Sequence, residues 1–127
     1  CIAFNINFII LEKNILQGNL ENIYKTSSGM AHQINFVTVT NLNNAVKSLK
    51  KNNYWITGMD GNADSLLKNS QWFNKNIIIF GSEGKGIKKT LKESCDQLMK
   101  INIQKKSKSI NVSNACAITL YNLNNKN

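Results

Sequence analysis

The chain has 127 residues and is 42% apolar, which is enough for one compact domain around a single core and too short for two. Its net charge of +9 favours a polyanionic partner such as nucleic acid. All 16 basic residues are lysines, so a site that depends on an arginine is excluded within these residues. The sequence has neither an apolar run of roughly 18 residues nor a signal-peptide pattern, so we expect a cytoplasmic protein with no membrane partner.

The first part of the chain predicts two strands and two helices. Residues 6–11 form a short apolar run with little alternation, which is typical of a strand buried on both faces of a parallel sheet. Residues 19–24 have weak helical character, and residues 25–31 form a polar connection that contains a glycine. The β-branched residues 36–40 predict a second strand. Asn41 is expected to cap the helix that follows, because apolar side chains then recur at helical spacing.

The middle of the chain predicts two further strands. Residues 54–59 form the first of them, and Asp-Gly-Asn at 60–62 predicts a turn. A short helical piece is expected around Leu66 and Leu67. The run Ile-Ile-Ile-Phe at 77–80 is interpreted as the central strand of the sheet.

The last part predicts a helix at 86–94, a strand at 98–103, a basic loop at 104–108 and a helix at 111–123. Residues 124–127 are expected to form a frayed tail. Strands and helices alternate along nearly the whole chain. This order predicts an α/β fold with a mainly parallel sheet and helices on both faces.

Cysteine and histidine residues give no sign of a metal site. Cys1, Cys95 and Cys116 are far apart, and His32 is the only histidine. This spacing favours neither zinc nor a disulfide framework, so we expect no metal. Cys95 and Cys116 fall on the apolar sides of predicted helices, where a cysteine usually acts as a small hydrophobic residue.

A glycine-rich turn follows the predicted central strand. Three glycines in the sequence Gly-Ser-Glu-Gly-Lys-Gly at 81–86 allow positive φ angles and let a ligand lie against bare main chain. The turn matches neither the P-loop pattern, because Ile87 follows Gly86, nor the order of glycines in a Rossmann turn. Glu83 would repel phosphate, so a ligand here is more plausibly neutral or cationic. The alternatives are a purely structural turn and a Glu83 that pairs with a neighbouring lysine.

A second polar turn, Ser-Ile-Asn-Val-Ser-Asn-Ala at 109–115, opens the last predicted helix. Together with the glycine-rich turn it frames a candidate pocket. Asn111 and Ser113 are also ordinary residue types for a helix N-cap, and capping is compatible with lining a site.

These two turns carry a resemblance to a known family. Residues 78–87, Cys95-Asp96, Ile101 and residues 109–115 resemble the second and third motifs of the SpoU (TrmH-like) RNA ribose 2'-O-methyltransferases of the SPOUT superfamily. Residues 25–31, 39–41 and 54–59 resemble most the bacterial branch that methylates a guanosine ribose in 23S ribosomal RNA. The resemblance covers residues 1–123, which we expect to form one methyltransferase domain.

The resemblance implies a C-terminal trefoil knot that binds S-adenosylmethionine, a homodimer formed through the knot region, and a reaction without metal. The partner would be RNA, with ribosomal RNA favoured and transfer RNA possible. The cofactor-binding positions implied are Gly81, Gly86, Ile101 and Ile110. The implied catalytic positions are Glu83, Ser109, Asn111 and Ser113.

The first motif of the family is missing from this sequence. That motif supplies an arginine just before an Ala-Phe-Gly-like segment, which Ala3-Phe4-Asn5 resembles. We therefore expect a chain truncated at its N-terminus, without the first strand of the domain. Two functions remain open: an S-adenosylmethionine-dependent RNA 2'-O-methyltransferase, and a catalytically dead remnant that at most binds cofactor or RNA. A generic nucleotide-binding module is the third and weakest interpretation. Lys105, Lys106 and Lys108 either hold RNA phosphates or form a solvated loop.

Overall fold

A computed structural model describes residues 1–16, 25, 27, 30–104 and 106–126. The predicted helix at 19–24, residues 26, 28 and 29 of the connection at 25–31, and Lys105 of the predicted basic loop lie outside the described residues. The contacts divide the chain into two compact units, Cys1–Ala45 and Val46–Asn127, where composition suggests a single core. Each unit is described by itself.

The first unit contains a pair of parallel strands. Strand β1 (Phe8–Glu12) pairs with β2 (Asn35–Val39), from Phe8 opposite Asn35 to Glu12 opposite Val39. A 3₁₀ helix at Ile2–Phe4, the short helix α1 (Lys13–Leu16) and a second 3₁₀ helix at Met30–Gln33 complete it. Both predicted strands are therefore confirmed, with β1 beginning and ending slightly later than its apolar run.

Helix α3 (Leu42–Lys51) begins and ends with local hydrogen bonds. Asn44 N–H donates to Asn41 Oδ1 at 3.1 Å, which confirms the predicted cap. At the other end Asn53 has a φ of 63°, and its N–H donates to Lys50 O at 3.0 Å. Asparagine tolerates this left-handed conformation better than most residues, so it ends the helix where glycine is more usual.

The second unit contains a four-stranded sheet in which all pairs are parallel. Its order is β4 (Ser65–Leu66), β6 (Gln97–Lys100), β3 (Trp55–Met59), β5 (Asn76–Phe80). The helical piece predicted around Leu66 and Leu67 is wrong in its first half. Leu66 pairs with Lys100 as a strand, and a 3₁₀ helix begins only at Leu67 (Leu67–Asn69).

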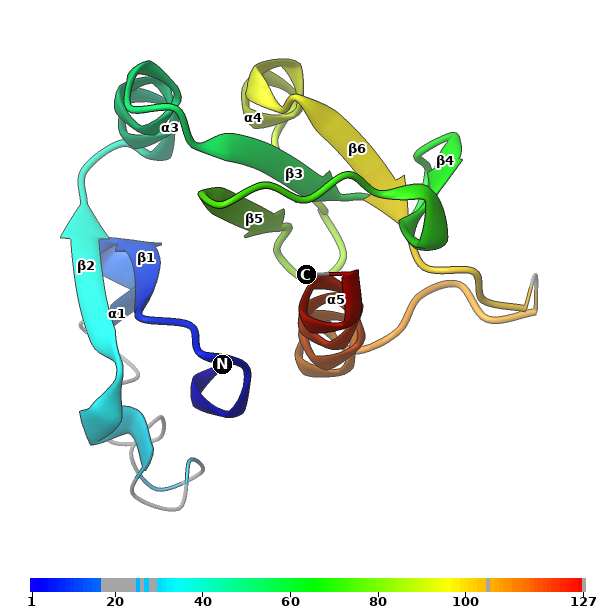
Figure 1. Ribbon diagram of the computed structural model, residues 1–127, viewed down its shortest axis with the longest axis horizontal. Coiled ribbons are helices and arrows are strands. Elements are labelled where there is room, and N and C mark those ends of the chain that lie inside the picture. Colours follow the sequence, from blue (N-terminus) through cyan, green and yellow to red (C-terminus); the bar gives the residue numbers. More distant parts are fainter. Residues whose placement is uncertain (17–24, 26, 28–29, 105, 127) are drawn as a thin grey trace. The chain divides into compact units, whose positions relative to one another are not determined.

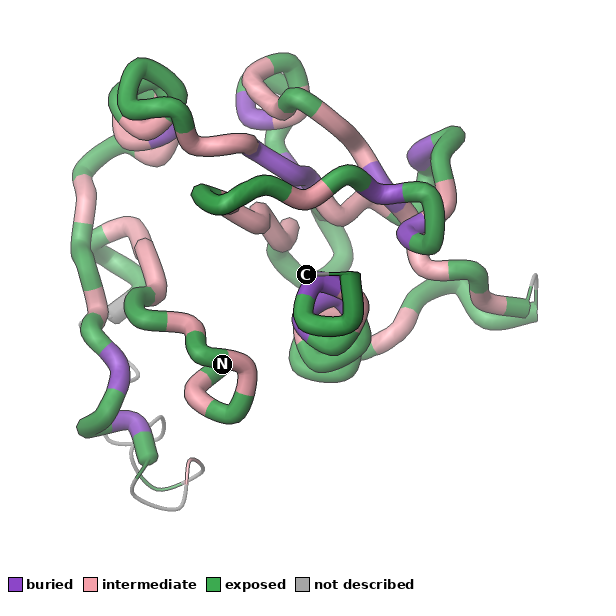
Figure 2. Tube along the Cα trace, viewed as in Figure 1, coloured by how far each residue is buried: buried purple, intermediate pink, exposed green. Residues whose placement is uncertain are grey.

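Helices lie on both sides of this sheet. Figure 1 shows α4 (Lys89–Ser94) on one side and α5 (Val112–Lys126) on the other. Ile56 and Thr57 follow one another on β3, so their side chains point to opposite faces, and both are 0% exposed. Figure 2 colours part of this strand as buried. Both faces of β3 are therefore covered, and the predicted α/β fold with a parallel sheet is confirmed. The interpretation of residues 77–80 as the central strand is wrong for the described sheet, because β3 lies between β6 and β5 and leaves β5 at an edge.

The two helices differ in length from the predicted ones. Helix α4 begins at Lys89 rather than Gly86, because the glycine-rich turn extends further than expected. Helix α5 continues beyond Leu123 to Lys126, whose Nζ donates to the main-chain oxygens of Lys68 and Ser70. No helix in the described part of the chain is both long and apolar enough to cross a membrane.

Candidate functional site

The glycine-rich turn after β5 closes on itself through its own main chain. Ser82 N–H donates to Gly86 O at 3.2 Å, and Gly86 N–H donates to Ser82 O at 2.8 Å. Gly84 and Gly86 have φ angles of 79° and 68°, which side chains rarely allow. A Cβ atom at either position would meet nothing within 4 Å. The turn therefore presents bare main chain, as the glycine pattern predicts.

Gly81 is required for a different reason. A Cβ atom at Gly81 would lie 2.1 Å from the carbonyl carbon of Gly86 and 2.4 Å from the nitrogen of Ile87. These are main-chain atoms that cannot rotate away, so any side chain at Gly81 forces the turn open. Ile87 is buried, which fixes the end of the turn against the core.

Glu83 lies exposed within this turn. Among the residues that the structure describes, it forms no hydrogen bond or ion pair, although Lys85 is close in sequence. The interpretation of Glu83 as the partner of a neighbouring lysine therefore has no support in the structure. Its carboxylate is available to a ligand.

An ion pair holds the helix that follows the turn. Lys92 Nζ on α4 lies 2.5 Å from Asp60 Oδ2, in the loop after β3, and Asn62 N–H donates to Asp60 Oδ1 at 3.1 Å. The ammonium group of Lys92 lowers the pKa of Asp60 below its ordinary value, against the opposing effect of partial burial, with help from the Asn62 N–H. The pair ties the loop after β3 to α4, the helix that follows the turn.

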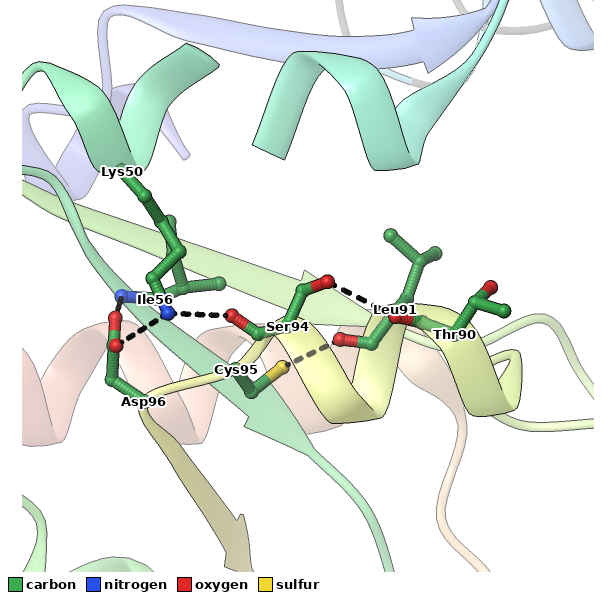
Figure 3. A network of polar contacts seen from close by, with 7 residues as sticks. All are labelled: Lys50, Ile56, Thr90, Leu91, Ser94, Cys95 and Asp96. Atoms are coloured by element: carbon green, nitrogen blue, oxygen red, sulfur yellow. Dashed lines mark hydrogen bonds and ion pairs between the residues drawn. The ribbon is translucent and has the colours of Figure 1, made fainter. Parts of the chain in front are cut away.

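Asp96 holds the far end of α4 (Figure 3). Its carboxylate accepts from Ile56 N–H at 2.8 Å and lies 2.7 Å from Lys50 Nζ, while its own N–H donates to Ile56 O at 2.8 Å. Lys50 Nζ also donates to Ser94 O at 3.1 Å. Asp96 precedes β6, at the edge of the sheet opposite the glycine-rich turn, so its role in this chain is structural.

The cysteines of the second unit are poor nucleophiles. Cys95 Sγ donates to Leu91 O at 3.2 Å (Figure 3), and burial, with the nearby Asp96 charge, raises the pKa of its thiol to about 11. Burial also raises the pKa of Cys116. Both thiols are protonated at neutral pH and act as the small hydrophobic residues that the sequence predicts.

The second predicted segment leads from β6 to α5. Asn111 caps α5: its Oδ1 accepts from Ser113 N–H at 2.8 Å, and its main-chain oxygen accepts from Ala115 N–H at 2.9 Å. Ser113 lies inside the first turn and is not the cap. Ser109 O accepts from Ser107 Oγ at 3.1 Å, and Ile110 is half-buried.

The two turns leave the sheet at the same edge. Strands β5 and β6 flank β3 and run parallel to it, so the turn after β5 and the segment after β6 begin on either side of β3. In the described residues, however, no hydrogen bond joins Gly81, Glu83 or Gly86 to residues 109–113. The structure therefore shows that both turns leave the same edge of the sheet. It does not show all eight predicted site residues in contact with one another.

A cavity of about 420 Å³ lies between α5 and the end of the sheet, and Ile101 is part of its wall. Sequence reasoning missed the α5 side chains that line it, because Ile118 and Tyr121 look like ordinary core residues of an apolar helix. In fact Ile118 is 43% and Tyr121 62% exposed. No group of three or more His, Cys, Asp or Glu residues within the described ranges could hold a metal ion.

Comparisons with known proteins agree with the geometry. A model described as the SpoU rRNA Methylase family matches residues 1–121. The 23S rRNA (guanosine-2'-O-)-methyltransferase RlmB of Coxiella burnetii is 34% identical over 119 residues, which are 94% of this chain and 48% of the relative. The protein of the same name from Escherichia coli K12 is 34% identical over 97 residues, 76% of this chain and 40% of its own length. The chain thus spans about half the length of the curated relatives it matches.

Solved structures share the fold at low identity. The A. aeolicus TrmH/SpoU tRNA modifying enzyme matches with a TM-score of 0.85 at 18% identity, over 98% of this chain and 64% of that one. The SpoU methyltransferase AviRb from Streptomyces viridochromogenes, solved with AdoMet, matches with a TM-score of 0.81 at 17% identity, over 98% and 51%. At this identity the matches show that the chain shares its fold with SpoU and TrmH methyltransferases.

The close approach at Gly81 predicts a selective loss of stability. Gly81→Ala should lower the free energy of unfolding by about 2 kcal/mol, because the new methyl group overlaps main-chain atoms of Gly86 and Ile87. Urea denaturation followed by circular dichroism measures this. Gly61→Ala is the matched control, since a Cβ atom there meets nothing within 4 Å. Equal stability of the two variants would contradict the geometry of the turn.

The pair of Asp60 and Lys92 predicts a loss of stability in acid. Because the folded pKa of Asp60 lies below its unfolded value, the contribution is complete above the unfolded value and disappears as pH falls through the folded one. The free energy of unfolding, measured by urea titration between pH 6 and pH 2.5, should fall below about pH 4. Asp60→Asn and Lys92→Gln should both flatten this part of the curve. An unchanged slope in both variants would refute the role of the pair.

Proposed function

The chain belongs to the SpoU rRNA methylase family, and we propose from this premise that it is the methyl-transferring part of an S-adenosylmethionine-dependent RNA ribose 2'-O-methyltransferase of the cytoplasm. The observation that carries the proposal is the family match over residues 1–121, which includes both the glycine-rich turn and the start of α5. Ribosomal RNA is the first substrate to test, because the curated relatives are named as 23S rRNA methyltransferases. Transfer RNA is the second, because a structural neighbour is described as a tRNA modifying enzyme.

The residues of the turn fit the proposed cofactor. Gly86 presents main chain with open space beside it, and Gly81 allows the close approach of Gly86 and Ile87 that shapes the turn. Half-buried Ile101 and Ile110 offer apolar surface to a flat adenine. When bound, S-adenosylmethionine supplies an electrophilic methyl group on a cationic sulfonium. The unpaired carboxylate of Glu83 suits such a cationic ligand and would repel a phosphate.

Polar groups at the start of α5 are proposed to orient the ribose hydroxyl, together with Glu83. Asn111 uses its amide oxygen to cap α5, which leaves its amide NH₂ as a donor. Ser113 and Ser109 are exposed and add hydroxyl groups to the same short segment. Orientation of the hydroxyl and the methyl donor for in-line attack is the proposed contribution of Glu83, Ser109, Asn111 and Ser113.

Lysines supply the proposed attraction for RNA. Lys85 lies in the glycine-rich turn, and Lys106 and Lys108 lie in the loop before α5, where all three are exposed. Lysines beside the turns can neutralise phosphates of a bound RNA, in keeping with the net charge of +9.

A homodimer is proposed through the exposed apolar side of α5. Ile118 and Tyr121 lie three positions apart on one side of the helix, are 43% and 62% exposed, and both line the cavity. Exposed apolar side chains gathered on one helix commonly mark a protein interface. A second copy of the chain would cover them.

The alternative is a remnant that binds cofactor or RNA and transfers no methyl group. Methyl transfer and binding, measured separately, distinguish the two.

Glu83 provides the test of the proposed activity. Transfer of a radioactive methyl group from S-adenosylmethionine to unmethylated ribosomal RNA should occur with the parent and fall at least about 100-fold in Glu83→Ala, because the carboxylate orients the reacting groups. Glu93→Ala is the control: Glu93 is also exposed, and its Oε1 lies 4.0 Å from Lys89 Nζ on α4. An undiminished rate in Glu83→Ala would remove Glu83 from the site. Binding without transfer in the parent would favour the remnant.

The proposed interface is tested by the state of association. Tyr121→Asp should shift the sedimentation coefficient from that of a dimer to that of a monomer, since a buried unpaired carboxylate opposes association. Asn124→Asp adds the same charge to an exposed position of α5 and should leave the dimer intact. A dimer that survives Tyr121→Asp would place the interface elsewhere.

A further inference from the structure

Residues 68–72, here called the strap, comprise the last two residues of the 3₁₀ helix after β4 and the three residues that follow it toward β5 (Figure 1). A single atom of α5 holds two side chains of the strap. Asn122 Oδ1 accepts from Ser70 Oγ at 3.0 Å and from Trp72 Nε1 at 3.0 Å. The indole N–H can only donate, so the atom of Asn122 that faces it must be the oxygen.

Lys126 holds the strap one helical turn further along α5. Its Nζ donates to Lys68 O at 2.6 Å and to Ser70 O at 3.1 Å. Ser70 is 6% exposed, and its hydroxyl and main-chain groups are all paired: its N–H donates to Leu67 O at 3.0 Å. Asn122 and Lys126, both on α5, therefore bind the same residue of the strap, Ser70.

The other side of the strap is bound to the sheet. Gln97 on β6 accepts from Gln71 N–H at 3.2 Å and donates to Gln71 O at 2.8 Å. Its Nε2 also lies 2.7 Å from Oγ1 of the fully buried Thr57 on β3. The strap thus joins α5 to β6, which leads into the second turn, and through Gln97 to β3, which lies between the strands that carry the two turns.

The hydrogen bonds of Asn122 and Lys126 restrict sliding and rotation of α5, which apolar packing alone does not. Leu120 and Leu123 bury α5 against the unit, but apolar burial has no preferred direction and permits the helix to slide or rotate. Hydrogen bonds weaken steeply with distance and angle, so those of Asn122 and Lys126 fix both movements. Because an α-helix of 15 residues is stiff, fixing this half also fixes Asn111 and Ser113 at its start.

We propose that Asn122 is a positioning residue: through the strap it sets the start of α5 relative to the ends of β3 and β6, and thereby the affinity of the proposed site for S-adenosylmethionine. The inference rests on the proposed function for its ligand. A merely structural Asn122, present only to pair Ser70 and Trp72, would affect overall stability without a local effect on the start of α5.

Three variants separate these roles. Asn122→Leu removes the acceptor at similar size, Asn122→Asp keeps it, and Asn124→Leu makes the same change on an exposed position of α5. Amide hydrogen exchange read by mass spectrometry should show protection of residues 113–120 reduced about ten-fold in Asn122→Leu, with β3 unchanged. Asn122→Asp and Asn124→Leu should match the parent. Equal loss of protection in β3 and α5, or no loss, would overturn the positioning role.

Calorimetric titration with S-adenosylmethionine is the second measurement. We expect the dissociation constant to rise about ten-fold in Asn122→Leu and to stay within about two-fold of the parent in Asn122→Asp and Asn124→Leu. A parent that binds, with an Asn122→Leu variant of equal affinity, overturns the inference. A parent that does not bind the cofactor refutes the proposed function instead, and the exchange measurement then decides the positioning role of Asn122 by itself.

Discussion

The burial of β3 on both faces is the constraint on which the second unit depends. Ile56 and Thr57 are 0% exposed, and a Cβ atom at the next residue, Gly58, would lie 2.6 Å from Leu98 Cδ2 and 2.9 Å from Cys95 Sγ. A strand enclosed in this way has no room to shift its register. The strands that flank β3 are therefore fixed as well, and the two polar turns leave them at the same edge of the sheet.

Local features of this fold could be predicted from the sequence, and contacts between distant residues could not. The cap at Asn41 and the strands β2, β3 and β5 depend on neighbouring residues, so apolar pattern and residue type were sufficient. Leu66 lies in a strand because it pairs with Lys100 on β6, 34 positions away. This pairing overrides a weak local preference for helix. The division into two units likewise depends on which contacts form, and composition does not encode it.

The candidate site shows the same limit. The glycines of the turn were predicted from their spacing, yet the reason for Gly81 is a close approach to Gly86 and Ile87 that only coordinates reveal. Asn122 and Gln97 gave no signal in the sequence, because their partners in the strap are 26 to 52 positions away. Asparagine is also frequent in this chain, so an asparagine at position 122 does not by itself indicate a special role.

Some carboxylates in the described part of this chain stabilise the fold, and others form no polar contact within it. With 16 lysines for only seven acidic residues, a carboxylate is expected to find a lysine, although among the described residues the exposed side chain of Asp64, like that of Glu83, forms no hydrogen bond or ion pair. Asp60 and Asp96 follow the expectation: each binds a lysine and a main-chain N–H, and both act near the C-terminal end of α4. Glu83 lies between Ser82 and Gly84 on a turn whose shape depends on main-chain hydrogen bonds alone, so the fold does not need its charge. A carboxylate that the fold does not use, on a turn that the fold holds rigidly, is free to serve a cationic ligand.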